Sequence, residues 1–474
     1  MSGGPQIDLG AILRFTGGLP RVDNFLPVDD LIGRFDALVE SSAGKVIRSR
    51  AGTSRLGEPI YAYTVGDGPR TALVVGGVHP NEPIGSWTAL WLAEAAAAGT
   101  DPIAGLGFRW CVVPTIDPDG ARLNEGWFAE PADRIGYGRA FYRPAPNSQA
   151  EWTFPTDYKN VYFDRVLPET LAFLRLIDDL RPELQVSLHN GELGGVYYYI
   201  SRDAPGLVGA LAAIPDHFGL PLDVGEPEMP HLRTYAPAIY RMDPVSTAYD
   251  YYENLGVDPS GFIAGSSSSH YAARYQTLCL VAELPYWKHP DAGDSSPTAE
   301  SYAAMLRRTA ADMIDMSDTL SDYLHRAQPH LILQTPFREA SEAFIPMFRS
   351  AGEADLKRAD DEPADRMATV AETFGCEDLL HCFRLRYGGI LLRAIEAETL
   401  AGTAPAELRR LRDEVADTYA QWQDAAAART GAEPIPINQL AGVQLAATLA
   451  AAAALVGEAN SETNGETNGE GTAL

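Results

Sequence analysis

Apolar residues along the first part of the chain alternate between strand-like and helix-like spacing. Short β-branched or aromatic runs occupy residues 60–65, 71–77 and 108–114, each flanked by Gly or Pro, a pattern typical of buried strands. Between the second and third runs, residues 84–98 follow a helical pattern that begins after Pro83, a residue favoured at helix starts. The order strand, loop, helix, strand indicates an α/β sheet.

The alternation of predicted strands and helices continues as far as residue 325. We expect helices over 26–41, 168–180 and 298–324, and strands over 184–189, 196–201 and 277–285. Two stretches without periodicity, 117–160 and 221–265, are irregular and contain Pro, and we expect ordered loops at a cleft there because long loops in a compact domain are usually functional. The predicted fold is α/β, with a mixed central sheet flanked by helices.

Beyond residue 326 the strand-like runs disappear and helix-length segments rich in Ala, Glu, Leu and Arg follow. We therefore divide the chain into a first domain over 1–325 and an appended all-helical module over 326–456. Residues 438–456 are apolar but rich in Ala and interrupted by Gln and Thr, which favours a packed helix over a membrane span. The acidic repeat over 457–474 cannot bury enough apolar surface to fold, so we predict a disordered tail.

Charge and cysteine content narrow the possible partners and compartments. The chain has 64 acidic and 37 basic residues and a formal net charge of −27, which disfavours nucleic acid and anionic membranes as partners. Its four cysteines have no metal-ligand spacing and are too few for a disulfide framework in a chain of this length. Since the first residues also lack the features of a secretion signal, we expect a cytoplasmic protein.

Three residues that could bind a metal follow predicted strands. His79 and Glu82 come after the run ending at residue 77, and His189 ends the run 184–189. Ligand sites in α/β sheets lie at the carboxyl ends of the strands, and zinc in hydrolases takes N and O ligands from three side chains. Each motif alone is weak, but together they indicate a metal site.

Glu283 interrupts the apolar strand 277–285 near its end. A buried carboxylate is costly unless it has a partner or a chemical task. Two interpretations follow: a salt bridge to a neighbouring Arg, or a general base beside a metal-bound water.

Several ordered motifs between residues 26 and 324 resemble the zinc metallocarboxypeptidases of the carboxypeptidase A and B type. The matching segments are GTSRLGEPI at 52–60, HPNE at 79–82, DPDG at 117–120, LPETLAFLRLIDDLRPELQVSLHNG ending in the His189 loop, and the serine-rich loop and strand at 264–285. Asp117 stands where the family has Asn in the third of these motifs.

The resemblance implies one Zn²⁺ per chain, bound by His79, Glu82 and His189, with Glu283 as the general base. It also implies that Arg143 stabilises the oxyanion and contacts substrate, that Asn160 binds substrate, and that His270 lies near the specificity pocket. The expected activity is cleavage of a C-terminal peptide or amide bond, on a peptide or acylated amino acid substrate.

The sequence departs from the family at two positions. Val161 follows Asn160 where the family has an Arg that grips the substrate carboxylate, and Phe262 lies near the position of a cleft tyrosine. Losing a bidentate carboxylate clamp is a large change, for which Arg165, Arg122 or Arg139 could compensate.

Two alternatives to a carboxypeptidase therefore stay open. One is a deacylase or amidase of the aspartoacylase type that acts on N-acyl amino acids, and the other is a pseudo-enzyme that binds peptide without cutting it. The helical module could dimerise, cover the cleft or recruit a partner, and the sequence does not choose among these roles.

Overall fold

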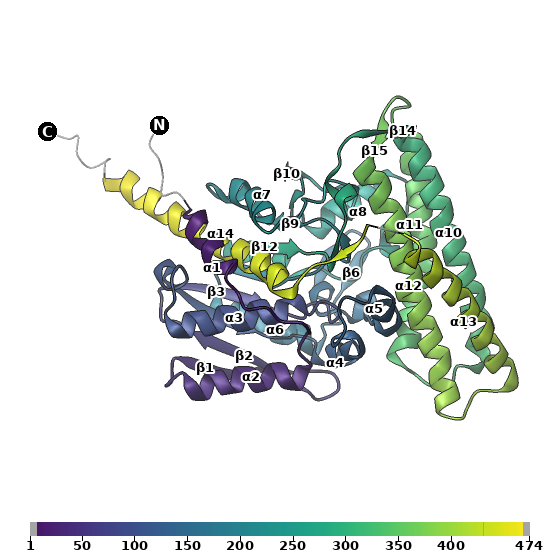
Figure 1. Ribbon diagram of the computed structural model, residues 1–474, viewed down its shortest axis with the longest axis horizontal. Helices are drawn as coiled ribbons and strands as arrows, with labels where there is room; N and C mark the ends of the chain where they lie inside the picture. The colour runs from purple at the N-terminus through teal and green to yellow at the C-terminus, as the bar shows by residue number, and fades with distance from the viewer. Residues whose placement is uncertain (1–6, 430, 468–474) are drawn as a thin grey trace.

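A nine-stranded mixed sheet forms the centre of the computed structural model, which describes residues 7–429 and 431–467. The strand order is β1-β2-β4-β3-β7-β12-β9-β11-β10 (Figure 1). The strands are β1 (Val46–Thr53), β2 (Pro59–Val65), β3 (Arg70–Val75), β4 (Phe108–Val113), β7 (Leu184–Leu188), β9 (Tyr197–Ile200), β10 (Thr234–Ala236), β11 (Ile239–Arg241) and β12 (Leu278–Glu283). This sheet confirms the mixed α/β fold that the sequence predicts.

The four central strands, β4, β3, β7 and β12, run parallel to one another. Nearly all their residues are buried, because helices cover both faces of the sheet, and parallel strands of this kind are continuous apolar runs in sequence. Their carboxyl ends consequently meet at one edge of the sheet, which is where functional side chains of α/β proteins gather.

Helices pack on both faces of the sheet around two separate apolar clusters. One face carries α1 (Leu9–Thr16), α2 (Val28–Ser41), α3 (Ile84–Ala98), α7 (Leu207–His217) and α14 (Ile437–Thr467). The other carries α6 (Pro168–Leu180) and α9 (Ser268–Ala272).

The two irregular stretches contain short elements. The first holds α4 (Pro118–Arg122), α5 (Arg134–Ala140), β5 (Thr156–Tyr158) and β6 (Val161–Phe163), and the second holds β10, β11 and α8 (Val245–Asn254). The remaining short strands are β8 (Leu193–Gly194), β13 (Trp287–Lys288), β14 (Pro297–Ser301), β15 (Met367–Thr369) and β16 (Glu433–Pro434).

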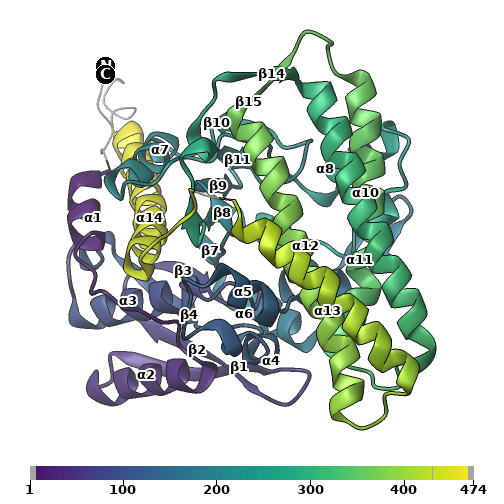
Figure 2. The same ribbon diagram turned by 45° about the vertical axis from the view of Figure 1, so that its right-hand side comes forward.

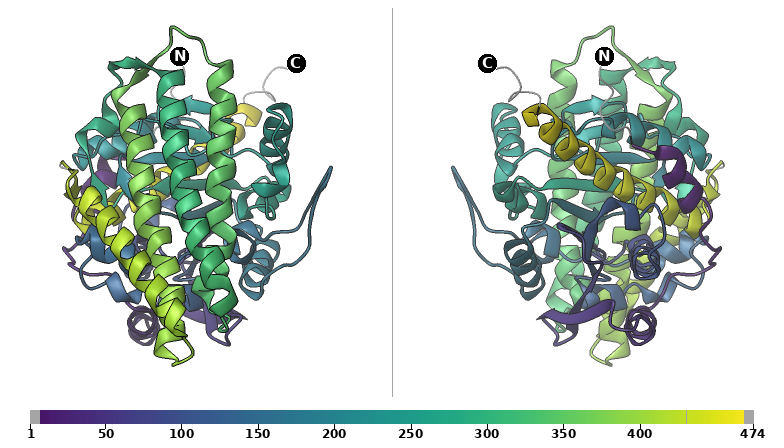
Figure 3. Two further views of the ribbon diagram at one scale, coloured as in Figure 1. Left: turned by 90° about the vertical axis from the view of Figure 1, so that its right-hand side faces the viewer. Right: turned by 90° about the vertical axis from the view of Figure 1, so that its left-hand side faces the viewer.

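Four long helices form a separate layer beside the sheet: α10 (Tyr302–Ala327), α11 (Pro336–Asp361), α12 (Val370–Leu400) and α13 (Ala406–Ala427). Figure 3 shows them side by side at one end of the molecule, and Figure 2 shows α12 passing close to α5, which it contacts. The layer begins earlier than the predicted module, because α10 packs chiefly against α11 rather than against the sheet.

The last helix, α14, lies on the sheet rather than in the helical layer. It packs against α1, α3 and α7 and contacts β7 and β12 (Figure 1). Its segment Ile437–Asn460 is long and apolar enough to cross a membrane, yet 89% of its most apolar window is buried inside the protein, which confirms the predicted packed helix. The helix continues to Thr467, into the tail expected to be disordered, and residues 468–474 lie outside the described residues.

Candidate metal centre

Three neighbouring parallel strands deliver the candidate site residues to the same sheet edge. His79 and Glu82 lie in the loop between β3 and α3, His189 directly follows β7, and Glu283 is the last residue of β12. The turn after β3 requires glycine at position 77, where φ is +63° and an added Cβ would lie 2.4 Å from the Thr115 hydroxyl oxygen. Strand order and this tight turn together direct the loop with His79 toward His189.

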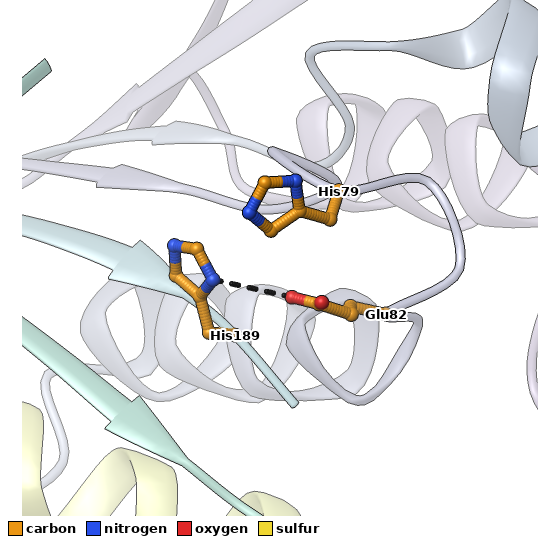
Figure 4. Close-up of side chains that lie close together, drawn as sticks. All are labelled: His79, Glu82 and His189. Atoms are coloured by element: carbon orange, nitrogen blue, oxygen red, sulfur yellow. Dashed lines mark ion pairs between the residues drawn. The ribbon is translucent and has the colours of Figure 1, made fainter. Parts of the chain in front are cut away.

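The side chains of His79, Glu82 and His189 converge and are buried (Figure 4). One potential ligand atom from each lies within 4.8 Å of the other two. His189 Nδ1 is 3.2 Å from Glu82 Oε2 and 3.4 Å from Glu283 Oε1. The sequence motifs from two strands therefore meet in one cluster, with Glu283 beside it.

Backbone and side-chain donors hold Glu82 in place from two directions. Its Oε2 accepts a hydrogen bond from the Asn190 N–H at 3.1 Å, and its Oε1 accepts one from Arg143 Nη1 at 3.2 Å. Asn190 Oδ1 in turn accepts from the Ile84 N–H at the start of α3. The loop after β7 and the start of α3 are thus tied together at the site.

Burial and mutual charge shift the ionisation of these groups. Burial, helped by the charges of Arg143 and His189, lowers the pKa of His79 well below its usual value. Burial alone would also lower the pKa of His189, but Glu283 and Glu82 outweigh burial and raise it to about 9. Burial raises the pKa of Glu283 well above its usual range, and Glu82 adds to this rise while His189 opposes it. Two buried carboxylates in one cluster favour a cation between them.

The residues fit a zinc ion. Two imidazoles and one carboxylate are the donor set found in hydrolytic zinc sites, where a fourth position stays free. His79 Nδ1 is buried and has no hydrogen-bond partner among the described residues, as expected of a nitrogen reserved for a ligand. His79, Glu82 and His189 would hold the ion.

Arg143, predicted to assist catalysis, lies beside this cluster. Besides its contact with Glu82, its Nε donates to Gln149 Oε1 at 3.2 Å. Its carboxylate partner is therefore the buried Glu82, and the guanidinium is held at the metal cluster from both sides.

Asn160 and His270 lie away from the cluster. Both are exposed, and among the described residues neither side chain forms a hydrogen bond or ion pair with His79, Glu82, His189 or Glu283. Asn160 lines a separate cavity of about 400 Å³ together with Arg165, Phe262 and Met347. His270 sits on α9, where its backbone N–H donates to the Ser267 hydroxyl.

The three arginines proposed to replace the family's carboxylate clamp differ in their partners. Arg122 pairs with Asp29 and Glu58, and Arg139 pairs with Glu396. Arg165 lines the cavity beside Asn160, with its guanidinium 5.8 Å from the centre of the Phe163 ring, and it has no ion pair among the described residues. Arg165 is therefore the one of the three that is free to bind an anion.

Sequence reasoning missed several buried polar groups around the cluster. Glu151 is buried, its Oε1 accepts from the Ser268 N–H and hydroxyl, and its charge raises the pKa of His189. Gln444 donates from Nε2 to the His189 carbonyl oxygen at 2.9 Å. The signal for Gln444 was present in the sequence as a polar residue within an apolar, Ala-rich run, but its partner was not.

The strand that carries Glu283 is covered less completely near its end. Val281, two residues before Glu283 on the same face of the strand, is only partly buried although β12 is a central strand. Residues i and i+2 of a strand point to the same side, so Val281 and Glu283 share one face of β12.

The sequence model of the zinc carboxypeptidase family matches residues 35–205. This segment of the chain is similar to the zinc carboxypeptidases. The match includes His79, Glu82, Arg143 and His189, and it confirms the resemblance for the motifs between residues 52 and 191. The motif at 264–285, which contains Glu283 and His270, lies outside the matched segment. It supports a hydrolase of the metallopeptidase type.

Solved structures similar to this protein include three hydrolases. Carboxypeptidase A from Helicoverpa armigera matches with a TM-score of 0.37 and 12% identity, over 74% of this chain and 80% of that chain. A metallo-carboxypeptidase from Burkholderia cenocepacia gives a TM-score of 0.30 and 15% identity, over 70% and 69%. The murein-tripeptide amidase MpaA from Escherichia coli O157 gives 0.27 and 20%, over 50% and 82%. No curated protein sequence matches the chain.

Proposed function

We propose that this protein is a zinc-dependent hydrolase that cleaves a C-terminal peptide or amide bond, with Glu283 as general base. The observation that carries the proposal is the position of Glu283, buried 3.4 Å from His189 Nδ1 at the end of the strand next to β7. Its ion-pair partner in the described residues is that histidine, not an arginine, which favours a chemical role over a structural salt bridge.

A zinc ion bound by His79, Glu82 and His189 would supply Lewis acidity for the scissile carbonyl and lower the pKa of water. Glu283 would accept the proton of the attacking water and return it to the leaving amine, for which its raised pKa is suited. Arg143, oriented by Glu82 and Gln149, would donate hydrogen bonds to the developing oxyanion.

For the substrate carboxylate we propose Arg165. Val161 is buried on β6 and offers no charge, whereas Arg165 lines the same cavity as Asn160. Guanidinium groups bind carboxylates through paired hydrogen bonds, so Arg165→Leu should raise KM for substrates with a free C-terminus. Arg139→Leu is the matched control, since Arg139 already pairs with Glu396.

A second candidate, an amidase or deacylase, is favoured by Val161 itself. Without an arginine next to Asn160, the enzyme could act on a substrate that presents no free peptide C-terminus. An Arg165→Leu variant with unchanged KM for C-terminal peptides, or a wild-type preference for N-acyl amino acids, would favour this candidate.

The test combines metal content with turnover. Purified protein should contain about one zinc per chain and release single C-terminal residues from a peptide library, and a chelator should stop the release. Glu283→Gln should keep the zinc and lower kcat by roughly 10²–10⁴, the usual contribution of general base catalysis. Wild-type turnover in Glu283→Gln would remove this residue from the mechanism, and absence of metal from the wild type would refute the proposal.

A further inference from the structure

Gln444 is a buried polar residue in the apolar helix α14. It is fully buried, its Nε2 donates to the His189 carbonyl oxygen at 2.9 Å, and its Oε1 accepts from the Thr88 hydroxyl at 2.7 Å. Thr88 belongs to α3, the helix that begins just after Glu82. The side-chain amide of Gln444 therefore connects His189, a candidate metal ligand, to α3, the helix that follows Glu82.

Glu192 links the same loop to α12 through a buried ion-pair cluster. Its Oε2 lies 2.6 Å from Arg386 Nε on α12, and its Oε1 accepts from Arg134 Nε at 3.2 Å. Arg134 also pairs with Asp378 of α12 at 2.8 Å. All four side chains are at most 12% exposed, so solvent compensates little for a lost partner.

The loop held by these contacts orients two of the metal-site residues. It begins with His189, its Asn190 N–H donates to Glu82 Oε2, and the Glu192 carbonyl accepts from the Tyr286 N–H at 2.8 Å. A shift of this backbone would move His189 directly and would remove the hydrogen bond that orients Glu82.

We propose that Gln444 and the Glu192–Arg386 pair are positioning residues of the metal centre, so that the C-terminal helices α12 and α14 form part of the site. This inference rests on the proposed zinc-dependent function. Gln444 fixes the backbone at the third ligand from the α14 side, and Arg386 fixes the end of the same loop from the α12 side. Both elements lie outside the segment that matches the zinc carboxypeptidase family.

The test measures metal binding rather than activity. Gln444→Met and Glu192→Gln preserve side-chain size but remove the amide bridge and the negative charge, respectively. Partners behind metal ligands typically contribute 10–100-fold to metal affinity, so both variants should bind zinc at least about tenfold more weakly. Their Co²⁺-substituted forms should also show shifted d–d absorption bands, because the ligand geometry changes.

Two control variants separate positioning from general stability. Thr448→Val removes a fully buried hydroxyl from the same helix, one that donates within α14 to the Gln444 carbonyl. Arg139→Gln removes the pair of Arg139 with Glu396, another ion pair between α5 and α12. Both controls should keep wild-type zinc affinity and the wild-type Co²⁺ spectrum.

Two results would overturn the inference while leaving the proposed function intact. One is a folded Gln444→Met protein with unchanged zinc affinity and Co²⁺ spectrum, and the other is an equal loss of affinity in the controls. A wild-type protein that binds no zinc would instead overturn the proposed function together with this inference.

Discussion

Asp117 is a buried carboxylate whose ionisation should lower stability at neutral pH. It caps α4, with Oδ1 accepting from the Gly120 N–H at 2.9 Å. Its Oδ2 has no hydrogen-bond partner in the described part of the chain and lies 4.0 Å from Arg55 Nη2. Burial raises the pKa of Asp117 from 3.8 to about 7, although the Gly120 N–H and Arg55 oppose this rise. Asparagine, the residue that zinc carboxypeptidases have here, keeps the capping oxygen and removes the charge.

The sign and size of the effect of Asp117→Asn follow from this shift. Because the pKa of Asp117 is higher in the folded than in the unfolded state, its protonation stabilises the folded state. This contribution to the free energy of unfolding is fully present below about pH 4 and is lost as the pH rises through 7. A shift of about 3 units at 1.36 kcal/mol per unit is worth about 4 kcal/mol. The unpaired amide N–H₂ near Arg55 costs about 1–2 kcal/mol. The variant should therefore be about 2–3 kcal/mol more stable than wild type at pH 8 and no more stable at pH 4.

Urea unfolding of both proteins at pH 4 and pH 8 measures this difference. The difference in unfolding free energy between variant and wild type should change by about 4 kcal/mol from pH 4 to pH 8. The cost of the unpaired Asn amide does not affect this change, because it is present at both pH values. Asp119→Asn is the control, because Asp119 accepts hydrogen bonds from the Ser54 hydroxyl and the Leu56 N–H, and it should lower stability at both pH values. A stability difference for Asp117→Asn that is the same at pH 4 and pH 8 would refute the reasoning.

Two further predictions concern the metal site. Gly120→Ala would place a Cβ 2.7 Å from Pro80 Cγ, next to His79, and should weaken zinc binding about tenfold. Gly33→Ala, with open space around its Cβ, is the control. Wild-type zinc affinity in Gly120→Ala would contradict this prediction, because Pro80 would then have shifted without moving His79. Since His189 has a pKa of about 9 without metal and must be neutral to bind it, zinc binding at pH 7 should release about one proton from His189, and affinity should rise up to about pH 9. Calorimetry in two buffers of different ionisation enthalpy measures that proton, and a buffer-independent binding enthalpy would contradict the protonated state.

Local pattern was sufficient for the core of the fold. The helix predicted over 168–180 is α6, Pro168–Leu180. The run 60–65 lies within β2, and the run 108–114 covers β4 and one residue beyond it. Buried strands and an amphipathic helix that begins with Pro are recognisable from local sequence. The meeting of His79, Glu82 and His189 was also predictable, since the carboxyl ends of adjacent parallel strands share one edge.

Contacts between distant segments were not predictable from local pattern. Gln444 and His189 are 255 residues apart, and Arg134 and Asp378 are 244 apart, so no periodicity links them. The position of α14 on the sheet was not predictable for the same reason. A helix that is apolar all round must be buried, but the sequence does not say which surface buries it. In the structure this surface is the face of the sheet beside α3.

The position of α14 changes what the helical part of the chain can be. If the helical part were a detachable module, other elements would cover the sheet face beside α3. Instead, α14 itself contacts β7 and β12 on that face. Removing it would expose the face behind His189 and Glu283, and it would leave the His189 carbonyl and the Thr88 hydroxyl without their partner. Burial of the sheet and orientation of the loop that begins with His189 thus depend on the same helix. A loss of fold and a loss of metal affinity can therefore be separated only by single substitutions such as Gln444→Met, not by truncation.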